Sequence, residues 1–179
     1  MNEPIYIKNY QSPFGDLVIG SYEDKLVLCD WKYRKMRESI DLRIKSALKT
    51  EFITGSSSVI ESTINQREKY SLRKREVFEI PLLLIGTDFQ KLVWNKLLAI
   101  PFGQTTSYLK LSESLNNPKA NRAVASANGA NAISIIVPCH LVIGSNQELT
   151  GYAGGLTTKK KLLTLENNEW FNKQLQLFY

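Results

Sequence analysis

An apolar run that ends at a proline constrains this chain more than any other stretch of its sequence. Residues 131–141 carry a β-branched run before Pro138, which predicts a buried strand that stops at the proline. Cys139 and His140 follow directly, and His140 is the only histidine in the chain. A thiol beside an imidazole at the edge of a core is typical of an activated nucleophile. On these residues alone, Cys139 is equally well explained as a small buried apolar residue.

Length and composition are those of an ordinary globular protein. The 179 residues suffice for one domain or two small ones, and they are 43% hydrophobic and 22% charged. No apolar run reaches the roughly 20 residues that a membrane-spanning helix needs. The N-terminus lacks the basic-then-apolar layout of a signal peptide. Because two cysteines are too few for a disulfide framework, we expect a cytoplasmic protein.

The net charge and the small number of possible metal ligands limit which partners, metals and cofactors the chain could bind. A formal charge of +6 suits an anionic partner such as nucleic acid. One histidine and two cysteines cannot supply a four-ligand zinc site of these residue types within one molecule. The glycine patterns that bind nucleotide phosphates are missing from the sequence. We therefore expect neither a metal nor a cofactor.

The start of the chain is typical of an antiparallel β-meander. Short apolar runs alternate with turn residues at 12–15 and 23–25. Cys29 falls inside the third run without a histidine nearby, so we interpret it as a core residue. The three predicted strands cover residues 5–7, 17–22 and 26–31.

Helical and extended segments complete the first half. Residues 32–53 and 59–70 are predicted helices, and residues 77–82 alternate like an edge strand that tolerates a proline. We place a domain boundary after this strand. The predicted organisation is an N-terminal α/β domain at 1–84 and a C-terminal domain at 85–179.

The second half opens with a well-marked helix. Thr87 and Gln90 have the spacing of a capping box, and Pro101 with Gly103 ends the helix that this box opens. The apolar face of the helix is predicted to consist of Phe89, Leu92, Val93, Leu97 and Ile100.

Two shorter helices follow and predict a helix-turn-helix. Thr106 or Ser107 caps the first, the turn lies at 116–118, and the second covers 119–128. The second helix is rich in alanine, and Arg122 projects from it. A helix surface made of small side chains fits either tight packing against another helix or close approach to a nucleic-acid groove. The residues alone do not decide between these interpretations.

Glu166 occupies an unexpected position on the last predicted helix. A glycine-rich loop at 151–155 precedes this helix, which starts near Thr157. By helical spacing, Glu166 shares the apolar face of Leu162 and Leu163. A carboxylate turned toward a core needs a partner, and the single imidazole is the natural one. The alternative is a glutamate at the helix end that faces outward.

If Cys139, His140 and Glu166 converge, they support thiol chemistry. Glu166 would orient the imidazole, and His140 would take the thiol proton directly or through water. The same three groups could serve a cysteine hydrolase. A hydrolase, however, gives no reason for the helix-turn-helix or for Arg122.

Residues 138–142 read Pro-Cys-His-Leu-Val and resemble the Pro-Cys-His-Arg-Val signature of the O6-alkylguanine-DNA alkyltransferases. This family is also called the methylated-DNA–protein-cysteine methyltransferases. The N-terminal half resembles it loosely, through residues 12–15 and the strand pattern. Further blocks of the second half match in order and spacing: residues 86–90, 93–94, 100–103, 107–108, 117–120, 122–124, 128–129, 131, 151–152 and 154–156.

The resemblance implies an α/β protein with two domains. An N-terminal α+β domain, ribonuclease H-like with an antiparallel sheet, would precede a mainly α-helical domain with a winged-helix-like helix-turn-helix. The implied function is direct, single-turnover DNA repair by a monomer. The protein would bind double-stranded DNA through the minor groove and flip out O6-alkylguanine or, less readily, O4-alkylthymine. Its own cysteine would take the alkyl group irreversibly, without a cofactor.

The resemblance also assigns roles to residues. Cys139 would be the alkyl acceptor, activated by His140 and Glu166, with Asn131 ordering the network. Tyr108 would help to rotate the nucleotide and donate a hydrogen bond to the base. Arg122 would fill the vacated stack. The other substrate or DNA contacts that it implies are Ser107, Ala123, Val142, Tyr152 and Ala153.

One residue departs from the family signature. Leu141 stands where the family usually has arginine, which predicts intact chemistry but a lost salt bridge or phosphate contact. This departure keeps open an alkyltransferase-like protein that binds lesions without transfer. That class lacks the reactive cysteine, so Cys139 argues against it. Some relatives hold a structural zinc in the N-terminal half, and the ligand count here excludes it.

Overall fold

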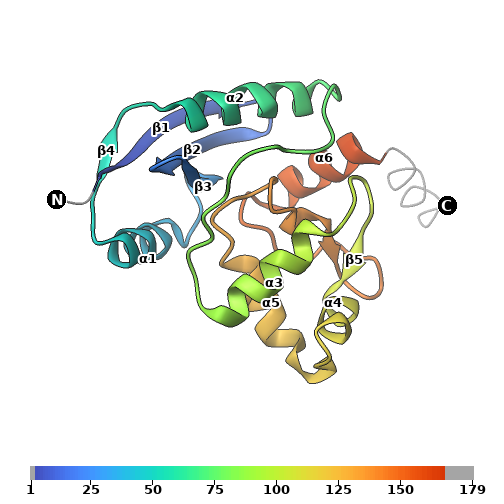
Figure 1. Cartoon of the computed structure of the whole chain (residues 1–179). Coiled ribbons are helices and arrows are strands. Elements are labelled where there is room, and N and C mark those ends of the chain that lie inside the picture. The colour runs from blue at the N-terminus through green and yellow to red at the C-terminus, as the bar shows by residue number, and fades with distance from the viewer. Residues whose placement is uncertain (1–2, 168–179) are drawn as a thin grey trace.

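The computed structural model of this chain describes residues 3–167 and has a mixed α/β fold. The N-terminal half contains a sheet with the helices α1 and α2, and the C-terminal half contains a group of further helices (Figure 1). This arrangement confirms the predicted combination of an antiparallel sheet with a mainly helical second part. The last residues of the predicted C-terminal domain, 168–179, lie outside the described residues.

The N-terminal sheet is the predicted meander with one added strand. Strands β1, β2 and β3 pair antiparallel, and β4 pairs parallel with β1, which gives the order β3-β2-β1-β4. Gly15, with φ of 134°, makes the first tight turn possible because it has no Cβ. The strands are β1 (Ile5–Ser12), β2 (Gly15–Tyr22), β3 (Lys25–Trp31) and β4 (Phe52–Thr54).

Helices α1 and α2 lie on opposite faces of this sheet (Figure 1). Helix α1 (Arg37–Leu48) ends earlier than predicted, because Lys49 adopts a left-handed conformation. The chain then enters β4, so the prediction of a helix up to residue 53 was wrong. Helix α2 (Ser58–Ser71) begins at the Ser57 cap, whose hydroxyl accepts a hydrogen bond from the Ile60 amide.

The predicted edge strand at 77–82 does not form. Only Leu82 makes a bridge to the sheet, opposite Leu26, and Val77 is exposed. Pro81 explains part of the difference, because it lacks the amide hydrogen that a ladder requires. Its carbonyl still accepts from the Leu26 amide at 2.8 Å. The segment therefore runs as an extended connection from α2 to α3, as Figure 1 shows in green.

Helix α3 (Asp88–Leu98) begins with the predicted capping box. The Thr87 hydroxyl accepts from the Gln90 amide, and the Gln90 side chain accepts from the Thr87 amide. The indole of Trp94 donates to the Ala127 carbonyl at 2.8 Å and so joins α3 to α5. Leu92, predicted to lie on the apolar face, is 49% exposed. The residues that α3 buries are Val93, Trp94 and Leu97.

The predicted helix-turn-helix outline is present. Helix α4 (Tyr108–Ser114) is capped by the Ser107 hydroxyl, which accepts from the Lys110 amide. A 3₁₀ turn, η1 (Pro118–Ala120), leads into α5 (Asn121–Gly129). Strands β5 (Thr106–Ser107) and β6 (Val142–Ile143) pair parallel, and α6 (Leu156–Glu166) closes the described fold.

Residues 131–141 form a buried turn and not the predicted strand. Ile135 has φ of 74°, a left-handed conformation that is rare for a β-branched residue and breaks any ladder. Only Ile133 pairs outward, as a bridge to Cys29 of β3, and Ser134 bridges back to Val137. The chain continues into the 3₁₀ turn η2 (Cys139–Leu141). The turn therefore presses the site segment against the edge of the N-terminal sheet.

The main hydrophobic core is shared by both halves of the described chain. It includes Leu17, Cys29 and Tyr70 from the first half with Trp94 and Val137 from the second. Cys29 is fully buried, as predicted. The boundary at 84/85 stays a prediction. None of the helices described in the fold has the length and apolarity needed to cross a membrane.

Candidate active site

Cys139 lies in a cavity of about 720 Å³ between the two halves of the fold. The N-terminal half contributes the segment from Tyr33 to Met36, and the second half contributes α4, α5 and the loop at 150–155. A cavity of this size falls in the range of about 300–1,000 Å³ that small-molecule sites occupy. It is therefore large enough to hold one nucleobase next to the thiol.

The Cys139 thiol is almost completely buried at the first position of η2. Its sulfur accepts a hydrogen bond from Asn131 Nδ2 at 3.2 Å. Burial raises the pKa of the Cys139 thiol, and the hydrogen bond from Asn131 only partly opposes that rise. The resting group is therefore a thiol, which needs a base to become a nucleophilic thiolate.

Asn131 holds the turn that carries the thiol. Its side-chain oxygen accepts from the Ile133 amide at 2.9 Å, and its Nδ2 donates to the Val137 carbonyl at 3.0 Å. The same Nδ2 reaches the sulfur of Cys139. Asn131 thus fixes the backbone on both sides of the turn and supplies a donor that stabilises negative charge on sulfur.

His140 and Glu166 form the predicted pair. His140 Nε2 lies 2.6 Å from Glu166 Oε1, and both side chains are buried. Glu166 Oε2 accepts from the Gly103 amide at 2.8 Å. Burial alone would raise the pKa of Glu166, but the hydrogen bonds from His140, Tyr70 and Gly103 outweigh it and lower this pKa. A carboxylate therefore faces the imidazole at neutral pH.

The remaining imidazole nitrogen, His140 Nδ1, is buried and has no hydrogen-bond partner among the described residues. When Nε2–H donates to Glu166, Nδ1 carries a lone pair and can accept a proton. Cys139 and His140 are not directly hydrogen-bonded, since the sulfur pairs with Asn131. The pair thus offers a base on the residue that follows the thiol in the 3₁₀ turn η2.

Three of the predicted substrate contacts line the cavity: Tyr108, Tyr152 and Ala153. Burial raises the pKa of Tyr108 and raises that of Tyr152 further, so both phenols remain hydrogen-bond donors. The Tyr152 ring packs edge-on against the His140 ring, with centroids 6.4 Å apart. Asn128, which the sequence did not single out, places its Nδ2 3.5 Å from the Tyr108 hydroxyl.

The other predicted contacts lie outside this cavity. The Ser107 hydroxyl caps α4, and the Val142 side chain is buried in the main core. The Val142 carbonyl accepts from Lys159 Nζ at 2.6 Å. Arg122 and Ala123 are exposed on α5, beside the cavity wall that the same helix provides. Their predicted DNA contacts remain predictions.

Leu141 is an apolar core residue. It is 1% exposed and packs with Ile143 and Leu163 in a small cluster of its own. Leucine in this position buries apolar surface. The arginine that the family usually has here would need a polar partner if it were buried in the same way. The described structure therefore gives the substitution a packing role and places it away from the thiol cavity.

Sequence reasoning missed the N-terminal residues that support the site. Asp30 is fully buried and binds Arg34, whose guanidinium also donates to the carbonyls of Gly129 and Asn131. Tyr70 donates to Glu166. The Asp30 and Arg34 spacing of four residues was the one local signal. The site partners of Arg34 and Tyr70 lie about a hundred residues away in sequence, so no local sequence pattern could predict these contacts.

Fold and site together define a class of protein: one with a buried cysteine, a buried His–Glu pair whose histidine is the next residue, and a helix-turn-helix. Residues 88–168 match the family described as "6-O-methylguanine DNA methyltransferase, DNA binding domain". A methylated-DNA–protein-cysteine methyltransferase of Methanosarcina acetivorans is 38% identical over 92% of this chain and 99% of its own length. One of Mycobacterium tuberculosis is 37% identical over 92% and 93%. The chain belongs to the methylated-DNA–protein-cysteine methyltransferase family.

Solved structures agree with this assignment. The fold is similar to Mycobacterium tuberculosis O6-methylguanine methyltransferase, with a TM-score of 0.77 and 35% identity, covering 92% of this chain and 93% of the other. It is equally similar to a structure titled as that organism's OGT in complex with DNA, with a TM-score of 0.78, 35% identity, and coverage of 91% and 93%.

Proposed function

We propose that this protein repairs DNA by transferring the alkyl group of O6-alkylguanine to its own Cys139. The observation that carries the proposal is the position of the thiol. It lies in a base-sized cavity, between a His140–Glu166 pair and the helix-turn-helix. The proposed activity is that of a methylated-DNA–[protein]-cysteine S-methyltransferase. O4-alkylthymine is a second, less favoured substrate.

The proposed reaction is an in-line displacement. Cys139 Sγ attacks the alkyl carbon from the side opposite O6, so the S–C bond forms while the C–O6 bond breaks. The electron pair of the broken bond stays on the base. The thiol proton passes to His140 Nδ1, directly or through water. His140 then gives up this proton, directly or through water, to balance the one that the restored guanine takes up on its ring nitrogen. Because the product is a thioether, each protein molecule acts once.

The buried network supplies the activation that this displacement needs. The carboxylate of Glu166 stabilises the imidazolium that forms when His140 takes the proton. Asn131 donates to the developing thiolate. A positioned general base of this kind contributes about 10²–10⁴-fold to a rate. The half-buried phenol of Tyr108 lines the cavity, and we propose that it donates a hydrogen bond to the base.

The proposal includes how DNA reaches the site. The alkylated nucleotide is flipped out of the duplex, and Arg122 on α5 enters the stack from the minor groove. Support comes from the exposure of Arg122 and Ala123 on a helix rich in small residues. We also propose that the protein acts as a monomer, because every group assigned to transfer comes from one chain.

The finer fold assignments belong to the same proposal. We propose that the N-terminal sheet with α1 and α2 is ribonuclease H-like, and that α4, α5 and the strands β5 and β6 form a winged-helix-like unit. We further propose a cytoplasmic location. Both cysteines are free in the described structure, which suits a reducing compartment.

The test is incubation of the protein with duplex DNA that carries O6-methylguanine labelled in its methyl group. We expect one label per protein molecule, on Cys139, and restored guanine in the DNA. Cys139→Ser should take up no label. The matched control is Cys29→Ala, which removes the other, fully buried thiol and should leave labelling complete.

Two other outcomes would overturn the proposal. Tight binding of the lesion without label on Cys139 would indicate an alkyltransferase-like binding protein. Repeated turnover of an ester or amide in the absence of DNA would indicate a cysteine hydrolase.

A further inference from the structure

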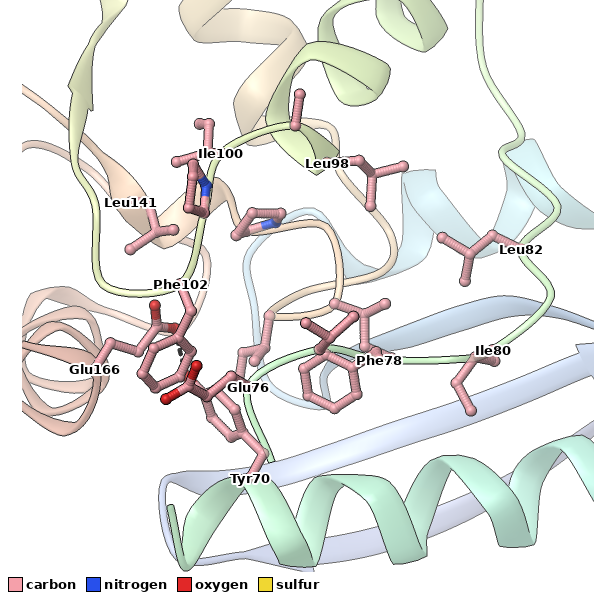
Figure 2. Close-up of a pocket in the computed structure, with 16 residues that line it drawn as sticks. Tyr70, Glu76, Phe78, Ile80, Leu82, Leu98, Ile100, Phe102, Leu141 and Glu166 are labelled. Atoms are coloured by element: carbon pink, nitrogen blue, oxygen red, sulfur yellow. Dashed lines mark hydrogen bonds between the residues drawn. The ribbon is translucent and has the colours of Figure 1, made fainter. Parts of the chain in front are cut away.

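Tyr70 connects the N-terminal half to the buried carboxylate of the site. It lies on the buried face of α2, and its hydroxyl donates to Glu166 Oε1 at 2.7 Å. His140 Nε2 meets the same oxygen at 2.6 Å. Figure 2 shows Tyr70 reaching from α2 toward Glu166 at the end of α6. The oxygen that holds the imidazole is therefore shared with a phenol from the other half of the protein.

The Tyr70 ring is fixed independently of this hydrogen bond. It packs against Phe78 with centroids 5.4 Å apart and edge-on against Phe102 at 6.1 Å. The guanidinium of Arg67 lies over the ring, 5.6 Å from its centroid. Tyr70 is 1% exposed, so its hydroxyl has little freedom to turn elsewhere. A rigid ring presents a rigid donor.

Glu166 needs such a donor, because packing alone does not enclose it. Its side chain borders a second cavity, of about 240 Å³, which Tyr70 and Leu141 also line (Figure 2). Three hydrogen bonds, from Tyr70, His140 and the Gly103 amide, fix its orientation instead. Removing one of them loosens the group that aims the imidazole.

We propose that Tyr70 is a positioning residue for alkyl transfer, which holds the Glu166 carboxylate in the orientation that keeps His140 Nδ1 free for the thiol proton. The inference rests on the proposed function and deepens it, because it gives the N-terminal half a part in the chemistry. Tyr70 acts through Glu166 and does not touch the reacting atoms.

Tyr70→Phe is the direct test, because it keeps the ring contacts and removes only the hydroxyl. A hydrogen bond to a charged group is among the stronger ones in proteins, so we expect transfer to Cys139 to slow by roughly tenfold or more. The low-pH limb of the rate profile should move to higher pH. The lost donor had favoured the ionised carboxylate, and without it Glu166 requires a higher pH to ionise.

Two comparisons separate this role from packing. Phe78→Leu disturbs the same aromatic contact without touching a hydrogen bond, so the limb should stay in place even if the protein is less stable. In a Glu166→Gln background, adding Tyr70→Phe should slow alkyl transfer little further, because the carboxylate that Tyr70 binds is already gone. The rates are measured with labelled duplex O6-methylguanine from about pH 4 to about pH 8, so that the range includes the titration of a carboxyl group.

The inference fails if Tyr70→Phe retains the wild-type rate and profile, or if its cost is undiminished beside Glu166→Gln. Either result would leave Tyr70 as a core residue only. Failure of the proposed function looks different, because the wild-type protein itself would then place no label on Cys139.

Discussion

Lys159 is a buried amine at the scale of single residues, and it supports the strand that follows the reactive cysteine. Its Nζ donates to the Val142 carbonyl at 2.6 Å and to the Thr150 carbonyl at 2.8 Å. The pKa of Lys159 falls to about 8, because burial disfavours its charged form. Both carbonyls belong to segments that border the thiol cavity or lead into it. Charge on this amine therefore affects the stability of the site.

The lowered pKa predicts a pH dependence of stability. The unfolded chain holds the Lys159 proton up to its ordinary value of 10.5, whereas the folded chain releases it near 8. Between these values the unfolded state binds more protons, so the free energy of unfolding rises with pH, by up to roughly 3 kcal/mol. Below about pH 8 the desolvation penalty is present in full.

Lys159→Met should abolish this rise, which denaturant unfolding at a series of pH values will measure. The exposed Lys161→Met, two residues along the same helix, is the matched control and should keep the wild-type slope. An unchanged difference between wild type and Lys159→Met across this pH range would contradict the prediction.

Residues differ in how far the sequence could predict their roles. Glu166 was found because a charge on an apolar helix face demands a partner, and that partner is the only histidine. Tyr70 and Arg34 were not found. Each looks locally like an ordinary helix or loop residue, and each acts on a group about a hundred positions away.

At the scale of elements, the loop at 151–155 forms one wall of the thiol cavity and packs on β3. The Trp31 ring at the end of β3 lies against it, edge-on to Tyr152 at 6.0 Å. A Cβ added at Gly154 would come within 2.6–2.8 Å of three Trp31 ring atoms. Only glycine lets this loop approach so closely, and that approach places Tyr152 and Ala153 in the cavity.

Gly154→Ala should therefore push the loop away from β3. Overpacking of this kind typically costs about 1–3 kcal/mol of stability. Displacement of the cavity wall by about 1 Å can slow a reaction by around 10²-fold. We expect slower alkyl transfer and a lower melting temperature. Gly151→Ala in the same loop is the control for stability, because its added Cβ meets nothing within 4 Å. Equal melting temperatures for the two variants would refute the close-approach role.

Elements with local signals were predicted well, and those that depend on distant contacts were not. The Thr87 capping box and the Ser107 cap each depend on residues close together in sequence, and both helices begin where predicted. Residues 131–141 follow β-propensity, yet they fold as a turn with Ile135 in a left-handed conformation. That conformation persists because the surrounding structure holds it, from β3 on one side and Asn131 on the other.

For the whole molecule, Arg34 and Asp30 fasten the N-terminal half to the segment that carries the site. Asp30 is fully buried and accepts from Arg34, Arg37 and the Ser134 hydroxyl. Arg34 extends further, to the carbonyls of Gly129 and Asn131. The backbone between α5 and the buried turn is thus held by a charge from the other half.

Arg34→Ala should lower the free energy of unfolding by roughly 3–5 kcal/mol, the usual cost of breaking a buried charge pair from one side. Two carbonyls lose their donor at the same time. Arg37→Ala is the matched control. Arg37 also binds Asp30, but its other contact is to the partly exposed Asp41, so we expect a clearly smaller loss. Denaturant unfolding of both variants measures the difference. A cost for Arg34→Ala no greater than that for Arg37→Ala would show that the contacts of Arg34 with Gly129 and Asn131 do not stabilise the junction of the two halves.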